Sequence, residues 1–146
     1  MNWLHVLKTA VLCTIAALAG GLGVSGIAYF LFDVSASSTG FDKHPVLFAL
    51  SGICIAPLLE TYIFVAVGAV FQRFHTKTRL SLSVAVFSLI HIAGGVTKCL
   101  LVIWPGGVYA YAYFYLGKTK RESYWIAAIG HAIHNTVLIV PALIFA

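Results

Sequence analysis

Residues 127–140 read A-A-I-G-H-A-I-H-N-T-V-L-I-V, an apolar run that is interrupted by two histidines and one asparagine. A run of this composition is typical of a helix that lies in a membrane. A polar side chain taken out of water without a partner costs on the order of several kcal/mol. Side chains from other parts of the chain are therefore expected to meet His131, His134 or Asn135 inside the bilayer.

The composition of the whole chain agrees with a membrane protein. Hydrophobic residues make up 61% of the 146 residues, charged residues make up 9%, and the mean hydropathy is +0.99. Soluble domains average about 25% charged residues. The length leaves room for about five spans of about 20 residues each. We therefore expect a single all-α domain over residues 1–146, an integral membrane bundle of about five transmembrane helices.

Five apolar runs, separated by loops and basic turns, predict the positions of these helices. A serine-rich segment from Asp33 to Pro45 is expected to be a loop, and the sequence W-P-G-G is expected to break the fourth run. The predicted spans cover residues 9–32, 46–71, 80–92, 98–116 and 123–145.

The basic residues predict the orientation of the chain. Most of them fall on one side if the N-terminus is cytoplasmic, and only Lys43 and Lys98 fall on the other, as the positive-inside rule requires. The net charge of +5 is thus explained by topology, and no nucleic-acid partner is expected. The expected location is a bacterial inner membrane.

Four polar residues on three of the predicted spans share one depth. With a rise of about 1.5 Å per residue, each lies about 15–21 Å from the nearest cytoplasmic basic residue. We therefore expect Glu60 and His91 to be the partners of His131 and Asn135. An ionisable cluster at this depth in a membrane indicates a functional site.

Local spacing supports this expectation. His131 and Asn135 are four residues apart and share a helix face, as do Phe87 and His91. Phe87 is expected to pack and shape the pocket. Pro57, one turn before Glu60, removes a backbone donor and can locally open its helix.

These residues form three short motifs, E-T-Y-I-F-V (60–65), F-S-L-I-H (87–91) and H-A-I-H-N (131–135). Over residues 46–140 the chain resembles the CPBP intramembrane proteases, which include the Rce1-type CAAX prenyl endopeptidases and the bacterial Abi relatives. Their signatures are E-E-x-x-x-R, F-x-x-x-H and H-x-x-x-N. This chain departs from the first signature, since Thr61 replaces the second glutamate and Val65 replaces the arginine.

The resemblance implies an intramembrane endopeptidase without a metal or a cofactor. Glu60 would act as the general base, His91 would orient the water, and His131 with Asn135 would stabilise the oxyanion. The implied substrate is a peptide or a membrane-anchored protein. A monomer and an oligomer are both compatible with this interpretation.

Two alternatives remain open at this stage. The loss of the second acid and the arginine is compatible with an inactive relative, a membrane binding or immunity protein. Glu60, His91 and His131 could also ligate zinc, and histidines on separate helices could ligate haem iron.

The other polar and aromatic residues are given structural interpretations. His134 is interpreted as a packing or channel-lining residue, and Thr61 is expected to bond its own backbone. The aromatic stretch 109–115 is interpreted as an interfacial belt. The cysteines show no C-x-x-C spacing and are expected to be buried: Cys13, Cys54 and Cys99.

Overall fold

The computed structural model describes residues 1–32 and 44–145, which form helices and short turns without a strand. The prediction of an all-α fold is confirmed. Most of the expected loop from Asp33 to Pro45 lies outside the described residues, and so does Lys43. The elements are α1 Trp3–Phe32, α2 Pro45–Leu50, the π-helical turn η1 Ser51–Ile55, α3 Ala56–Val70, α4 Thr76–Ile90, the 3₁₀ turn η2 His91–Gly94, α5 Val96–Leu101, α6 Ile103–Tyr111, the π-helical turn η3 Ala112–Leu116 and α7 Lys120–Phe145.

Within the described part of the chain, four segments are long and apolar enough to cross a membrane. They are Trp3–Val24, Pro45–Val70, Val96–Leu116 and Lys120–Ile144. The protein is therefore an integral membrane protein, as predicted. The remaining predicted span, residues 80–92, corresponds to α4, which has only 15 residues. At about 1.5 Å per residue α4 is about 22 Å long, which is less than the hydrocarbon core of about 30 Å.

The helix break in the fourth predicted span differs from the expectation. The sequence W-P-G-G does not interrupt the helix, because the turn between α5 and α6 lies two residues before Trp104, at Val102. Pro105 then falls in the first turn of α6, where a missing backbone N–H leaves no intrahelical bond unmade.

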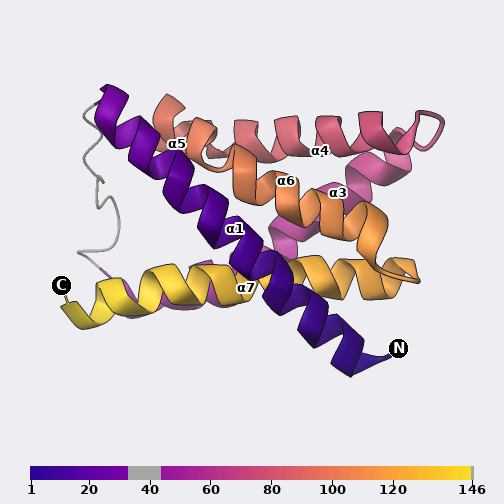
Figure 1. The fold of residues 1–146 in the computed structure, drawn as a ribbon, viewed down its shortest axis with the longest axis horizontal. Helices are drawn as coiled ribbons and strands as arrows, with labels where there is room; N and C mark the ends of the chain where they lie inside the picture. The colour runs from indigo at the N-terminus through magenta and orange to yellow at the C-terminus, as the bar shows by residue number, and fades with distance from the viewer. Residues whose placement is uncertain (33–43, 146) are drawn as a thin grey trace.

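Helix α7 lies at the centre of the packing. Helix α1 crosses it at a steep angle (Figure 1), and α3 also packs against it. The crossing with α1 is close because a Cβ at Gly130 would lie only 3.1 Å from the carbonyl oxygen of Ala10. The Thr14 hydroxyl donates a hydrogen bond of 2.8 Å to the Gly130 carbonyl. Small residues and a buried hydroxyl are the usual means by which membrane helices associate.

Three large aromatic side chains fill the centre of the bundle. Phe64 of α3, Phe87 of α4 and Tyr109 of α6 are at most 2% exposed, and the rings of Phe64 and Phe87 are 5.7 Å apart. Two of the three cysteines depart from the expectation that they are buried. Cys13 is buried in this core, but Cys99 is only half-buried and Cys54 is exposed on the surface of the bundle.

Candidate active site

A cavity of about 540 Å³ is lined by Glu60 and by histidines of α7 and of the segment after α4. We call it the polar cavity. It is bounded by α1, the segment from α2 to α3, the end of α4, α5 and α7. The polar and charged residues that line it are Ser51, Glu60, His91, Lys98, His131, His134 and Asn135.

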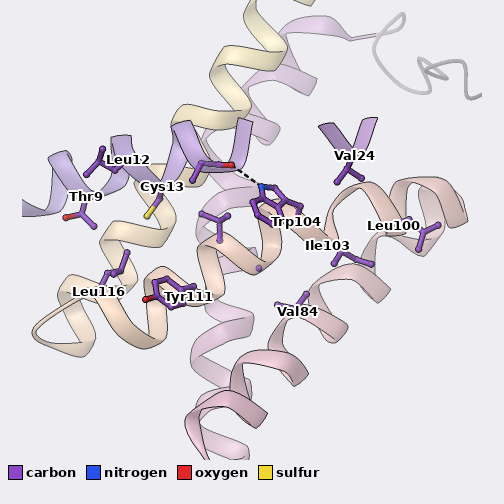
Figure 2. Close-up of a pocket in the computed structure, with 13 residues that line it drawn as sticks. Thr9, Leu12, Cys13, Val24, Val84, Leu100, Ile103, Trp104, Tyr111 and Leu116 are labelled. Carbon is purple, nitrogen blue, oxygen red and sulfur yellow. Dashed lines mark hydrogen bonds between the residues drawn. The ribbon is translucent and has the colours of Figure 1, made fainter. Parts of the chain in front are cut away.

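A second cavity, of about 900 Å³, lies between α1 and the segment from α4 to α6 (Figure 2). The indole N–H of Trp104 donates to the carbonyl oxygen of Ala16 beside it, at 3.0 Å. Of the described residues, those that line this cavity include no histidine, acid or basic residue. The polar cavity is therefore the candidate site for acid–base chemistry.

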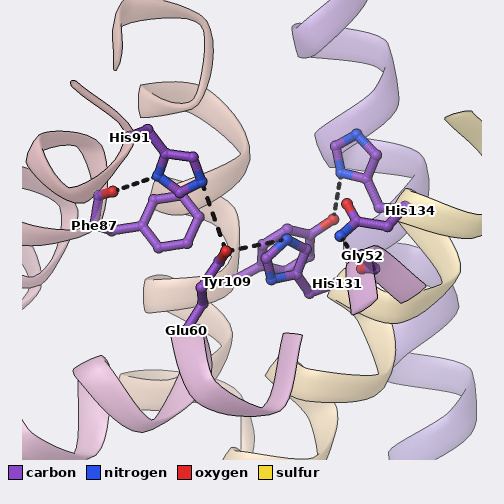
Figure 3. A network of polar contacts seen from close by, with 8 residues as sticks. Gly52, Glu60, Phe87, His91, Tyr109, His131 and His134 are labelled. Carbon is purple, nitrogen blue, oxygen red and sulfur yellow. Dashed lines mark hydrogen bonds and ion pairs between the residues drawn. The ribbon is translucent and has the colours of Figure 1, made fainter. Parts of the chain in front are cut away.

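The carboxylate of Glu60 lies between two imidazole rings from two other helices (Figure 3). Its Oε1 is 3.7 Å from Nε2 of His91, and its Oε2 is 3.7 Å from Nε2 of His131. Both distances exceed a hydrogen bond of about 2.7–3.2 Å, but two atoms so separated can both contact one water. The Glu60 side chain is 19% exposed and that of His131 only 8%, so the acid is more accessible than the second ring.

The end of α4 determines which nitrogen of His91 carries a proton. Nδ1 lies 2.7 Å from the carbonyl oxygen of Phe87, one turn earlier. A carbonyl oxygen can only accept, so Nδ1 must be the donor. In a neutral ring Nε2 then has a free lone pair, and this atom faces Glu60. Nε2 of His91 and the Glu60 carboxylate are then both acceptors, so a proton or a water molecule between them is favoured.

His131 is held by aromatic rings. The ring of Tyr109 stacks on it with centroids 4.9 Å apart and planes 15° apart, and the ring of Phe87 contacts it edge-on at 5.9 Å. Phe87 also packs on His91 at 4.9 Å. The packing role expected for Phe87 is thus confirmed, because this one ring contacts both histidines.

Gly106 on α6 allows Phe87 this position. A Cβ at residue 106 would lie 2.5 Å from Cδ1 of Phe87, so Gly106→Ala must displace the ring and the two histidines that contact it. We expect a loss of about 1–3 kcal/mol in unfolding free energy. We also expect a fall of about 10²-fold in the cleavage rate proposed below. Thermal unfolding in detergent and a peptide-cleavage assay measure the two effects.

Gly107→Ala is the matched control, because a Cβ there meets nothing within 4 Å. It adds the same methyl group one residue later and should change neither quantity appreciably. Equal effects of the two substitutions would show that the contact with Phe87 is unimportant.

Asn135 has a different partner from the one expected. Its Nδ2 donates to the carbonyl oxygen of Gly52 at 2.7 Å, instead of meeting Glu60 or His91. The cause is the π-helical turn η1, in which the N–H of Ala56 donates to Ser51, five residues back. In this register the donor for Gly52 would be residue 57, which is a proline. Asn135 supplies the missing donor and keeps its second amide hydrogen for another acceptor.

A double-mutant cycle tests this account of Asn135. Asn135→Ala leaves the Gly52 carbonyl without its donor and should lower the unfolding free energy by about 1–3 kcal/mol. Pro57→Ala restores a backbone N–H, so in that background the same substitution should cost clearly less. Chemical or thermal unfolding in detergent gives the four values. Strictly additive effects would contradict the proposed link between Pro57 and Asn135.

The two departures in the first motif also have defined positions. Thr61 is fully buried, and its hydroxyl has no hydrogen-bond partner among the described residues, so the expected bond to its own backbone is wrong. Packing alone encloses this side chain. Val65 is half-buried and does not line the polar cavity. The cation that does line it is Lys98, whose stem passes over Gly94.

Sequence reasoning missed two contributors to this site. One is the Gly52 carbonyl, which depends on a helix register that no motif displays. The other is Tyr109, which was placed in an interfacial belt although it is fully buried and hydrogen-bonded to Nδ1 of His134 at 2.7 Å. The spacing between Gly106 and Tyr109 could have shown that Tyr109 points inward. Residues three apart share a helix face, and a glycine on that face allows another helix to pack closely.

The chain also matches a known protein family. Residues 42–137 match the sequence pattern of a family described as type II CAAX prenyl endopeptidase, Rce1-like. The chain belongs to the Rce1-like family. The Rce1-like range includes Glu60, His91, His131 and Asn135, and the whole of α1 precedes it. No curated protein and no solved structure matches the chain. In this Rce1-like chain, the described residues include no group of three acids, histidines or cysteines placed to hold a metal ion.

Proposed function

We propose that this Rce1-like protein is an intramembrane endopeptidase that cleaves with a water molecule activated by Glu60. The observation that carries the proposal is the position of one carboxylate, 3.7 Å from imidazole nitrogens of two other helices, in a cavity among membrane-spanning helices. Such a group can take a proton from water and be oriented by its neighbours.

Each step of the hydrolysis can be assigned to a group in the polar cavity. One O–H of the water donates a hydrogen bond to Nε2 of His91 and stays intact. The water transfers its other proton to Glu60 as its oxygen attacks the scissile carbonyl carbon. The negative charge that develops on the carbonyl oxygen accepts hydrogen bonds from Nε2–H of His131 and from the free amide hydrogen of Asn135. When the tetrahedral intermediate collapses, the C–N bond breaks and Glu60 returns the proton to the leaving amine.

The proposed substrate is a peptide or a membrane-anchored protein that enters from the bilayer. Prenylated CAAX chains are one member of this class. The exposed ammonium group of Lys98 lines the same cavity as Glu60 and is complementary to a carboxylate on the substrate. The distribution of basic residues favours a cytoplasmic N-terminus, and we propose a bacterial inner membrane as the location.

A comparison of membranes that contain the wild type or Glu60→Gln tests the proposal. Mass spectrometry should detect at least one membrane peptide or protein that is cleaved by the wild type and accumulates uncleaved with the variant. Cleavage should continue in the presence of a chelator, which separates this mechanism from a zinc-dependent one. Identical peptide profiles for the two proteins would reject proteolysis and favour a binding role.

A further inference from the structure

One nitrogen of His131 lacks the contact that usually fixes a working histidine. Nε2 faces Glu60 at 3.7 Å, whereas Nδ1 is buried and has no hydrogen-bond partner among the described residues. In most histidines that act on substrates or metals, a hydrogen bond to the second nitrogen sets the orientation of the ring. Another contact must therefore set the orientation of His131.

The ring of Tyr109 provides that contact. It lies parallel to the imidazole, with centroids 4.9 Å apart and planes 15° apart, and it is completely buried. A stacked neighbour restricts tilting of the imidazole plane, which is the motion that would move Nε2 away from Glu60. Phe87 limits the ring from another direction, with its plane at 62°.

Tyr109 is itself fixed by its hydroxyl group. The hydroxyl forms a hydrogen bond of 2.7 Å with Nδ1 of His134, three residues after His131 on α7. Its ring also packs against the backbone of α7 at Gly130, where a Cβ would be in ordinary contact with Cε1 of Tyr109, at 3.5 Å. One tyrosine of α6 thus contacts two histidines of α7, one through its ring and one through its hydroxyl (Figure 3).

We infer that Tyr109 and His134 form a positioning pair that sets the orientation of His131 toward Glu60. Its importance for catalysis rests on the proposed function, but the geometry can be tested without any substrate. Tyr109 acts through the stacked ring, and His134 acts by preventing Tyr109 from rotating. Neither residue touches the reacting atoms in this proposal.

Nuclear magnetic resonance of the full chain in detergent micelles, with isotope-labelled histidine, tests the geometry. The ring protons of His131, assigned by their absence in His131→Gln, should be shifted upfield by the stacked tyrosine in the wild type. Tyr109→Phe keeps the ring but loses the hydrogen bond to His134, so it should reduce this shift without abolishing it and should change the Nδ1 signal of His134. Tyr109→Leu removes the ring and should lose the shift.

The wild-type spectrum is decisive even if Tyr109→Leu does not fold. Wild-type His131 ring protons without an upfield shift would overturn the inference, and so would a shift that persists in a folded Tyr109→Leu. The same variants separate positioning from simple packing in the cleavage assay. Tyr109→Leu should lower kcat by about 10–100-fold with little change in KM, and Tyr109→Phe should restore most of that rate.

The two proposals fail in different ways. If the wild type cleaves nothing, the proposed function is wrong, and the spectra still decide whether Tyr109 orients His131. If cleavage occurs but Tyr109→Leu and Tyr109→Phe have equal rates, the protease stands and the positioning pair is rejected.

Discussion

Glu60→Gln is expected to lower kcat for peptide cleavage by at least about 10³-fold, which corresponds to about 4 kcal/mol of lost transition-state stabilisation. Glutamine has nearly the same shape as glutamate but cannot take a proton from water. Because Glu60 is the only acid that lines the polar cavity among the described residues, no neighbouring carboxylate can take over this role. The measurement is the initial rate of cleavage of the peptide found by mass spectrometry, with purified protein in detergent or liposomes.

Glu122→Gln is the matched control for this experiment. Glu122 lies near the start of α7, outside the polar cavity, where its carboxylate accepts hydrogen bonds from the backbone N–H groups of Asn2 and Lys118. A glutamine there can still accept one of these bonds, so cleavage should change little. A Glu60→Gln protein that folds and keeps more than about a tenth of the wild-type rate would exclude Glu60 as the general base.

His131→Gln is expected to have the second-largest effect, a fall of about 10²–10³-fold in kcat with little change in KM. The proposed task of His131 is to donate Nε2–H to an oxyanion that exists only in the transition state. Its removal should therefore spare substrate binding. Cleavage rates measured over a range of substrate concentrations separate kcat from KM.

His75→Gln is the corresponding control, because His75 is exposed and precedes the first turn of α4, outside the polar cavity. It should leave both kinetic constants unchanged. If His131→Gln raised KM and left kcat intact, His131 would bind the ground state of the substrate, and the oxyanion role would be rejected.

The depth of a residue in the membrane could be estimated from the sequence, because each helical residue advances a fixed distance along the helix axis. Glu60, His91 and His131 lie on three helices, and a fixed rise per residue was sufficient to predict that they share one level. The structure brings these three side chains together. The same calculation placed Asn135 correctly in the polar cavity but not its hydrogen bond.

The partner of Asn135 could not be predicted because it depends on a backbone register. The π-helical turn η1 and Pro57 together leave the Gly52 carbonyl without an intrahelical donor. Pro57 suggested that the helix could open, but not which carbonyl would be left free. Every residue has a backbone carbonyl, so a search for polar side chains does not reveal which carbonyl lacks a donor.

The role of Tyr109 was hidden by its surroundings. The run Y-A-Y-A-Y-F-Y places aromatic rings on several faces of one helix, so hydrophobic periodicity does not identify the face that points inward. Only the packing against α7 separates the buried Tyr109 from the exposed Tyr111 and Tyr115.

The short length of α4 has a consequence for the lipid around the protein. A helix about 8 Å shorter than the hydrocarbon thickness is expected to draw the two leaflets together on its side of the bundle. His91 follows directly after this helix, so headgroups and bulk solvent should come closer to the polar cavity there than elsewhere on the perimeter. Lipids with longer acyl chains would deepen the distortion. Membrane thickness would then help to control how quickly water for the proposed hydrolysis reaches the polar cavity.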